Sequence, residues 1–115
     1  IELCKSTMPM NHQYAEQEPA RADVDALPGP LLLEFGSPWC GYCRAAHPLI
    51  EQAMQGHDGV RHLKIADGSG LSLGRSFRIK LWPTLVFMKD GSEVARLVRP
   101  GDAGVIGEAL ARIDA

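Results

Sequence analysis

Two cysteines separated by two residues, Cys40 and Cys43, are the side chains of this chain best suited to chemistry. They lie in the stretch SPWCGYCRAAHP, where a helical pattern begins. The amino end of a helix has free N–H groups and a partial positive charge, and both stabilise a thiolate. Cys43 falls in the first turn, so we expect it to be more buried and to keep a higher pKa. This asymmetry indicates thiol–disulfide exchange, in which Cys40 attacks and Cys43 resolves the mixed disulfide.

A zinc site is the structural alternative for such a pair. Structural zinc usually takes four ligands from two pairs of this kind, but the remaining cysteine of the chain is a single one, Cys4. His47 and His62 could contribute ligands, although their spacing is not a common zinc pattern. We therefore expect neither a metal nor a cofactor.

The segments around the cysteines predict a layered α/β domain. Residues 31–36 form an apolar run interrupted only by Glu34, which is typical of a strand buried on both faces. Residues 40–55 have helical periodicity, with Pro48 inside the helix. A strand with two buried faces needs helices on both sides of its sheet.

The remaining elements complete a mixed sheet of about four strands flanked by helices. We expect a strand at 60–66, short helices at 18–27 and 71–77, and a hairpin around the turn KDG at 89–91. The connection from the first strand to the second through a helix favours a parallel crossover. A last helix is predicted to start at an Asp102 cap and to bury one face, formed by Val105, Ile106, Ala109, Leu110 and Ile113.

Three further features suit a dithiol site. Glu34 is an acid in an apolar strand, where burial favours the protonated form, so it can accept the proton of Cys43. Lys64, in the next strand, would partner Glu34 if both face the same side, and would be solvated otherwise. A cis peptide bond before Pro83 would expose the backbone of Trp82 to an extended substrate, whereas a trans proline would simply begin an edge strand.

The stretches EFGSPWCGYC, LKIAD and WPTLVFMKDG, with the helix proline and the C-terminal amphipathic helix, resemble the thioredoxin family in order and spacing. The resemblance covers about residues 20–114 and implies the thioredoxin fold with a cis Pro83 beside the dithiol. It places the family's buried acid and its lysine partner at Glu34 and Lys64. The substrate-binding residues that it implies are Trp39, Gly41, Tyr42, Trp82, Pro83 and Thr84.

The chain departs from ordinary thioredoxins at several positions. Gly41 and Tyr42 replace the usual Gly-Pro, as in periplasmic disulfide isomerases and in catalytic domains of protein disulfide isomerase. Trp82 replaces a smaller residue and should crowd the substrate groove or offer it an aromatic surface. Gly101 is the candidate for the groove glycine after the last strand. Arg44 should add positive charge near the dithiol and favour the thiolate.

Length and composition limit the number of domains and the classes of partner. The chain has 115 residues, 45% of them hydrophobic and 23% charged, with a net charge of −2, which suits one globular domain. No basic excess points to nucleic acid, and no apolar run is long enough to span a membrane. We interpret residues 1–17 as a disordered leader or a cloning remnant and residues 18–115 as a thioredoxin-like domain.

These observations predict a protein-disulfide oxidoreductase, with the reductase direction favoured. We expect a monomer in the cytoplasm, with protein disulfides as substrates and a thioredoxin reductase or a glutathione system as the electron donor. The alternative is an isomerase or oxidase of an oxidising compartment such as the periplasm, if a signal peptide has been removed. A third hypothesis is a redox-gated binding module built around Trp39, Tyr42 and Trp82, with little turnover.

Overall fold

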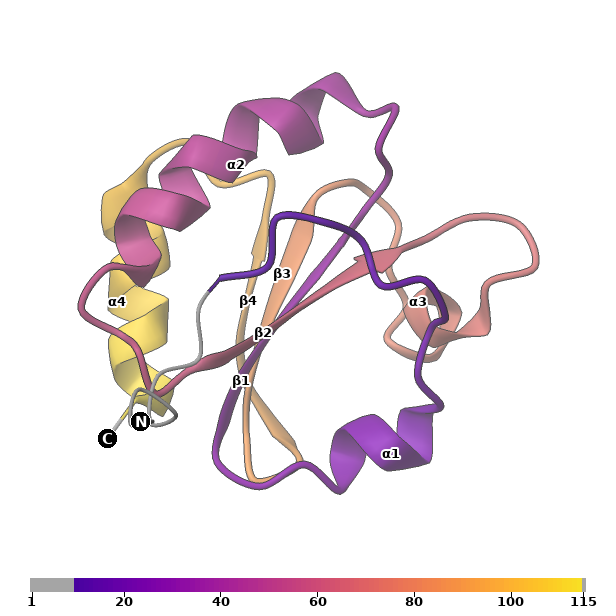
Figure 1. Ribbon diagram of the computed structural model, residues 1–115, viewed down its shortest axis with the longest axis horizontal. Coiled ribbons are helices and arrows are strands. Elements are labelled where there is room, and N and C mark those ends of the chain that lie inside the picture. The colour runs from indigo at the N-terminus through magenta and orange to yellow at the C-terminus, as the bar shows by residue number, and fades with distance from the viewer. Residues whose placement is uncertain (1–9, 115) are drawn as a thin grey trace, which may run out of the picture.

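The computed structural model describes residues 10–114 as a four-stranded mixed sheet with helices on both faces (Figure 1). The predicted α/β class and strand number are confirmed. The strands are β1 (Pro30–Gly36), β2 (Arg61–Ala66), β3 (Thr84–Lys89) and β4 (Ser92–Val98). The helices are α1 (Arg21–Asp25), α2 (Gly41–Met54), α3 (Ser72–Ser76) and α4 (Ala103–Ile113).

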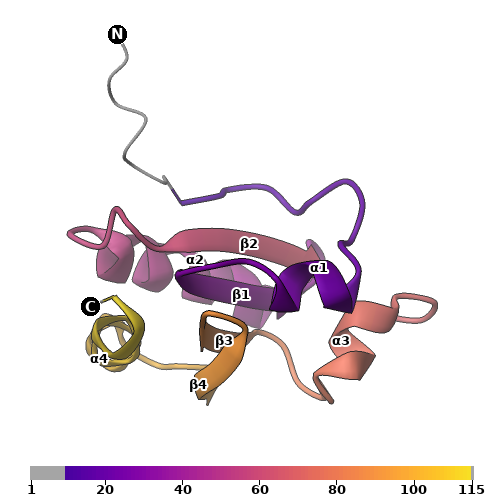
Figure 2. The same ribbon diagram turned by 90° about the horizontal axis from the view of Figure 1, so that it is seen from below.

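β1 is a central strand of the sheet, whose order is β2-β1-β3-β4. It pairs in parallel with β2 and antiparallel with β3. Figures 1 and 2 show α2 and α4 on one face of the sheet and α1 and α3 on the other. This double cover explains why β1 is apolar on both faces, since side chains of alternating direction all enter a core.

Each face of the sheet has its own hydrophobic core. Toward α2 and α4 the strands present side chains that pack against Ile50 and Leu110, chiefly Leu32, Leu85 and Phe87. Toward α1 and α3 they present Leu31, Leu33, Phe35 and Val86. Burial of each large apolar side chain contributes about 1.5–3 kcal/mol, so these cores hold β1, and the dithiol that follows it, in a fixed place.

The C-terminal helix begins as predicted and differs from the prediction at one position. The Asp102 side chain accepts a hydrogen bond from the Val105 N–H at 2.9 Å and thereby caps α4. Ile106, Leu110 and Ile113 are buried, but Val105 is 37% exposed. Val105 lies in the first turn at the margin of the apolar face, where the periodicity alone could not place the edge of the core.

Residues 10–17 form an irregular segment along the outer edge of β2 (Figure 1). The Ala15 N–H donates to the Lys64 carbonyl at 2.9 Å, the Asn11 N–H donates to His62 Nδ1 at 3.0 Å, and Met10 packs against the core. This part of the predicted leader therefore contacts the domain and covers an edge strand. Residues 1–9, with Cys4, lie outside the described residues.

Candidate active site

The dithiol lies at the end of the sheet where β1 ends and α2 begins. Cys40 is the N-cap residue of α2, and its Sγ accepts a hydrogen bond from the Cys43 N–H at 3.2 Å. Cys40 is partly exposed and Cys43 is buried. The N-terminus of α2 thus provides an N–H donor that stabilises negative charge on the outer sulfur, Cys40 Sγ.

The pKa values of the two thiols are shifted in opposite directions. For Cys40, partial burial alone would raise the pKa. It is outweighed by hydrogen bonds from Cys43 and the Tyr42 N–H and by the positive charge of Arg99, so the pKa of Cys40 is lowered. For Cys43, burial and the neighbouring Cys40 raise the pKa to about 11, although hydrogen bonds from Ser37 and Tyr14 oppose this. At neutral pH the outer sulfur is therefore the nucleophile and the inner one holds its proton.

The end of β1 makes room for the inner sulfur. A Cβ added to Gly36 would lie 2.6 Å from Cys43 Sγ and 3.0 Å from the Tyr14 hydroxyl oxygen. Only glycine permits this approach, so the sulfur and the hydroxyl both pack against bare backbone. Tyr14 comes from the irregular N-terminal segment, where no periodic pattern or motif marked it as a site residue.

The predicted acid, Glu34, is fully buried on the α2 side of β1. Its Oε1 lies 3.0 Å from His62 Nε2, and its Oε2 lies 3.9 Å from Lys64 Nζ, in line with the pairing of Glu34 and Lys64 across β1 and β2. Because the Asn11 N–H donates to His62 Nδ1, the imidazole proton is on Nε2 and is donated to Glu34.

Glu34 Oε2 has no hydrogen-bond partner among residues 10–114, and it is buried. Buried polar groups are nearly always hydrogen-bonded, so this oxygen is an exception that calls for an explanation. His62 was not predicted as a partner of Glu34. Its position two residues before Lys64, hence on the same face of β2, was the signal that could have identified it.

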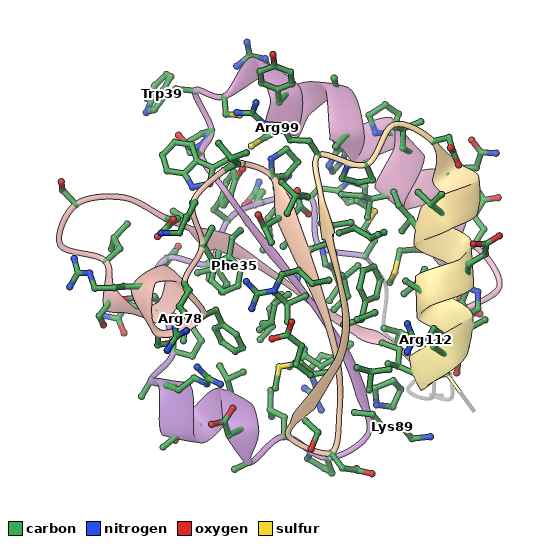
Figure 3. The ribbon with its side chains drawn as sticks, turned by 180° about the vertical axis from the view of Figure 1, so that it is seen from behind. Phe35, Trp39, Arg78, Lys89, Arg99 and Arg112 are labelled. Atoms are coloured by element: carbon green, nitrogen blue, oxygen red, sulfur yellow. The ribbon has the colours of Figure 1, made fainter. Side chains whose placement is uncertain are left out.

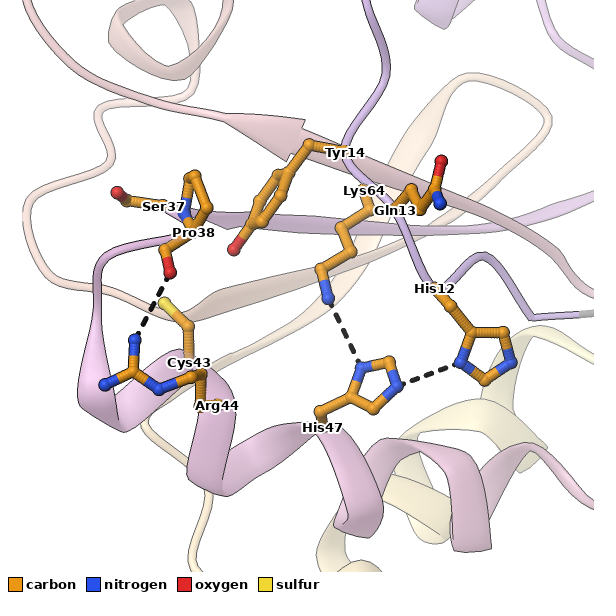
Figure 4. A pocket seen from close by; sticks show the side chains of 9 residues that line it. All are labelled: His12, Gln13, Tyr14, Ser37, Pro38, Cys43, Arg44, His47 and Lys64. Atoms are coloured by element: carbon orange, nitrogen blue, oxygen red, sulfur yellow. Dashed lines mark hydrogen bonds between the residues drawn. The ribbon is translucent and has the colours of Figure 1, made fainter.

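Beside Cys43 lies a cavity of about 450 Å³ (Figure 4). It is lined by Tyr14, Cys43, Lys64, His47 and His12, among others. Lys64 Nζ donates to His47 Nδ1 at 3.3 Å, so His47 Nε2 carries the proton and donates to His12 Nδ1 at 3.0 Å. Burial and the Lys64 charge lower the pKa of His47, which fits this neutral form. A hydrogen-bonded chain thus leads from the neighbour of Glu34 to the exposed His12.

Three of the residues predicted to bind substrate, Trp82, Pro83 and Thr84, lie where β3 begins. Pro83 is buried and follows a cis peptide bond, and the Thr84 hydroxyl donates to the Leu81 carbonyl at 2.6 Å. The Trp82 indole N–H donates to Asp67 Oδ2 at 2.9 Å. This contact ties the indole to the segment after β2.

The exposed aromatic surface comes instead from the residues around the first cysteine. Trp39 is 87% exposed and Tyr42 is 61% exposed, and Gly41 next to them is exposed as well. Trp82 is only partly exposed, and its indole N–H is held by Asp67, so it offers less free aromatic surface than Trp39 and Tyr42.

The residue that follows β4 at this end of the sheet is Arg99. It has a φ of 50°, whereas Gly101 is not in the left-handed region. The assignment of Gly101 as the groove glycine stays a prediction. The Arg99 N–H donates to the Pro83 carbonyl at 2.9 Å. Arg99 also supplies the charge that acts on Cys40, while Arg44 donates to the Pro38 carbonyl at 3.3 Å.

Residues 10–114 contain no group of three or more His, Cys, Asp or Glu side chains placed to hold a metal ion. None of the helices within these residues is long and apolar enough to cross a membrane.

Comparison with known proteins agrees with this geometry. The family model described as Thioredoxin matches residues 12–112. The structure of thioredoxin 2 from Pseudomonas aeruginosa PAO1 in its reduced form is 52% identical, with a TM-score of 0.80, and the match covers 90% of this chain and 96% of that one.

Curated relatives are similar over shorter segments. Thioredoxin 1 of Synechococcus elongatus is 36% identical over 60% of this chain and 65% of its own length. Thioredoxin Asp f 28 of Aspergillus fumigatus is 29% identical over 76% of this chain and 81% of its own. With its Cys-x-x-Cys pair at the start of α2, the chain belongs to the thioredoxin family of thiol–disulfide oxidoreductases.

Proposed function

We propose that this protein reduces disulfide bonds of other proteins. The observation that carries the proposal is the asymmetry of the dithiol: Cys40 is partly exposed with a lowered pKa, and Cys43 is buried with a pKa of about 11. A pair of this kind supplies one thiolate for attack on a substrate and one protected thiol for release of the product.

The reaction proceeds in two exchanges. The Cys40 thiolate attacks one sulfur of the substrate disulfide, which forms a mixed disulfide and releases the other substrate sulfur as a thiolate. Cys43 then loses its proton and attacks the Cys40 sulfur, so that the second substrate thiolate leaves and a Cys40–Cys43 disulfide remains. Two electrons pass to the substrate, and its two thiolates each take up a proton.

Glu34 is our candidate for the group that accepts the Cys43 proton, supported by its burial and by the free Oε2. Lys64 Nζ lies 3.9 Å from that oxygen. Trp39 and Tyr42 offer apolar surface to the substrate chain beside the nucleophile.

A trapping experiment tests the proposal. Cys43→Ser keeps the nucleophile and removes the resolving thiol, so we expect it to accumulate a covalent adduct with a disulfide protein, detected by intact mass. The matched variant Cys40→Ser should form no adduct. The wild type should accelerate insulin reduction by dithiothreitol, and a wild-type rate equal to the uncatalysed rate would contradict the proposal and favour the redox-gated binding module.

The direction of electron flow follows from the reduction potential of the pair. We propose a monomeric reductase of the cytoplasm, recharged by a thioredoxin reductase or a glutathione system, and hence a potential near or below about −250 mV. Equilibration in glutathione or dithiothreitol buffers, read by alkylation and mass, measures it. A potential above about −200 mV would instead assign the protein to oxidation or isomerisation in a compartment such as the periplasm.

A further inference from the structure

Arg99 occupies a backbone position that would suit glycine better. It follows β4 directly, at the same end of the molecule as Trp39 (Figure 3). Its φ of 50° lies in the left-handed region, which residues other than glycine, asparagine and aspartate adopt infrequently. Arginine is therefore an unusual residue at this position.

Two contacts hold the Arg99 side chain beside the nucleophile. Its Nε donates to the Trp82 carbonyl at 2.8 Å, and its guanidinium carbon lies 4.0 Å from the centre of the Tyr42 ring. Trp82 precedes the buried Pro83, and Tyr42 lies between the two cysteines. The guanidinium therefore links the segment before Pro83 to the first turn of α2, which Cys40 caps, and its charge contributes to the lowered pKa of Cys40.

These contacts leave the outer end of the guanidinium available. Arg99 is exposed, and its two terminal nitrogens make no hydrogen bond with any other residue in the range 10–114. No carboxylate of that range forms an ion pair with it. A planar guanidinium that is already oriented by stacking and by one hydrogen bond can bind a carboxylate through two parallel N–H donors.

A second group of positive charges lies at a hollow that includes Val98, the residue before Arg99. This hollow of about 180 Å³ is lined by the exposed Arg78 and Lys80 together with apolar Leu81 and Val98, and no acidic residue lines it. Arg96, which also reaches the hollow, is paired with Glu93. Arg99 and this hollow therefore both offer positive charge, and the hollow adds apolar contact.

We propose that Arg99 selects substrates in which an acidic side chain adjoins the cysteine that Cys40 attacks. This inference rests on the proposed function. The substrate carboxylate binds the two terminal nitrogens of Arg99, while the apolar part of the substrate covers Tyr42, Leu81 and Val98. The selected partner is an acidic segment of a disulfide-bonded protein.

Two disulfide peptides that differ only by Glu or Gln next to one cysteine test the inference. The readout is the ratio of the kcat/KM values for the two peptides, because a change in Cys40 reactivity alters both values equally and cancels. We expect the wild type to favour the Glu peptide about tenfold, which corresponds to about 1.4 kcal/mol. The preference should decrease in about 1 M salt, where charges are screened.

Substitutions assign the preference to this residue. Arg99→Gln should reduce the ratio to below about twofold, and so should Arg99→Gly, for which folding is not in question because glycine suits the backbone there. The matched control Arg44→Gln removes an exposed arginine near Cys40 and should leave the ratio unchanged. A wild-type ratio below about twofold, or an undiminished ratio in both Arg99 variants, would overturn the inference. If neither peptide were reduced above the uncatalysed rate, the proposed function itself would be refuted.

Discussion

The first prediction concerns the contribution of the hydrogen bond between His62 and Glu34 to the stability of the fold. Both side chains are fully buried, and the imidazole Nε2 is the hydrogen-bond donor to Glu34 among residues 10–114. His62→Leu replaces the imidazole by an apolar side chain of similar size. Glu34 Oε1 then has no donor, and Glu34 Oε2 already has none. A buried acceptor left unsatisfied costs about 1–3 kcal/mol, and more when it is charged, so we expect the free energy of unfolding to fall by about 3 kcal/mol.

The measurement is urea unfolding of the reduced protein, followed by tryptophan fluorescence. Domains of this kind are stable by about 5–15 kcal/mol, so His62→Leu should still fold, with a transition about 1 to 3 M lower in urea. The double variant Glu34→Leu/His62→Leu removes both polar groups of this contact, so it should lose less stability than the sum of the two single variants, although the Asn11 N–H then lacks its acceptor and Lys64 Nζ its carboxylate. His12→Leu, at an exposed position, is the matched control and should change stability by less than about 0.5 kcal/mol.

Either of two results would refute this reasoning. One is a His62→Leu variant within about 1 kcal/mol of the wild type, which would mean that water or a shift of Lys64 satisfies Glu34. The other is a double variant that loses as much stability as the sum of the two single variants, which would mean that the two side chains contribute by packing and not by their hydrogen bond.

Four further predictions concern the same site and the C-terminal helix α4. Gly36→Ala should lower the free energy of unfolding by about 1–3 kcal/mol and slow insulin reduction, because the added methyl displaces Cys43 Sγ; Gly107→Ala, where a methyl meets no atom within 4 Å, should not lower it. Iodoacetamide should label Cys40 with a midpoint below pH 9.0 and Cys43 only near pH 11, and coincident midpoints would contradict the asymmetry. The folded protein should also lose stability between about pH 9 and 11, because it retains the Cys43 proton that the unfolded chain has released. Asp102→Ala should cost about 1 kcal/mol in urea unfolding, whereas Asp102→Asn, which keeps the cap acceptor, should cost less.

Local patterns were sufficient to predict most of the fold. The apolar run of β1, the periodicity of α2, the hairpin at Asp90 and Gly91, and the Asp102 cap each depend on neighbours within a few residues. Asp90 and Gly91 both have positive φ, which the Asp-Gly pair adopts readily in a two-residue turn. Val105 was misplaced because the width of a buried helical face depends on what packs against it and not on the period.

The chemistry of the pair could also be predicted from the sequence. Two cysteines at the start of a helix specify an outer and an inner sulfur, since position relative to the free N–H groups is a local property. The sequence did not determine on which face of the sheet Lys64 lies. Side chains alternate between the two faces along a strand, so a shift of one residue moves every side chain to the other face. The register of β1 and β2 settled it by pairing Glu34 with Lys64.

What the sequence by itself determined is therefore the dithiol, the layered α/β fold and the buried acid, all of which follow from short-range spacing. Only the tertiary structure decided which distant groups surround them. It placed Tyr14 beside Cys43, His62 against Glu34, and the Arg99 guanidinium over the Tyr42 ring. These contacts join segments separated by tens of residues, and no local pattern specifies them, because each depends on how the edge of β2 and the end of β4 meet the rest of the sheet.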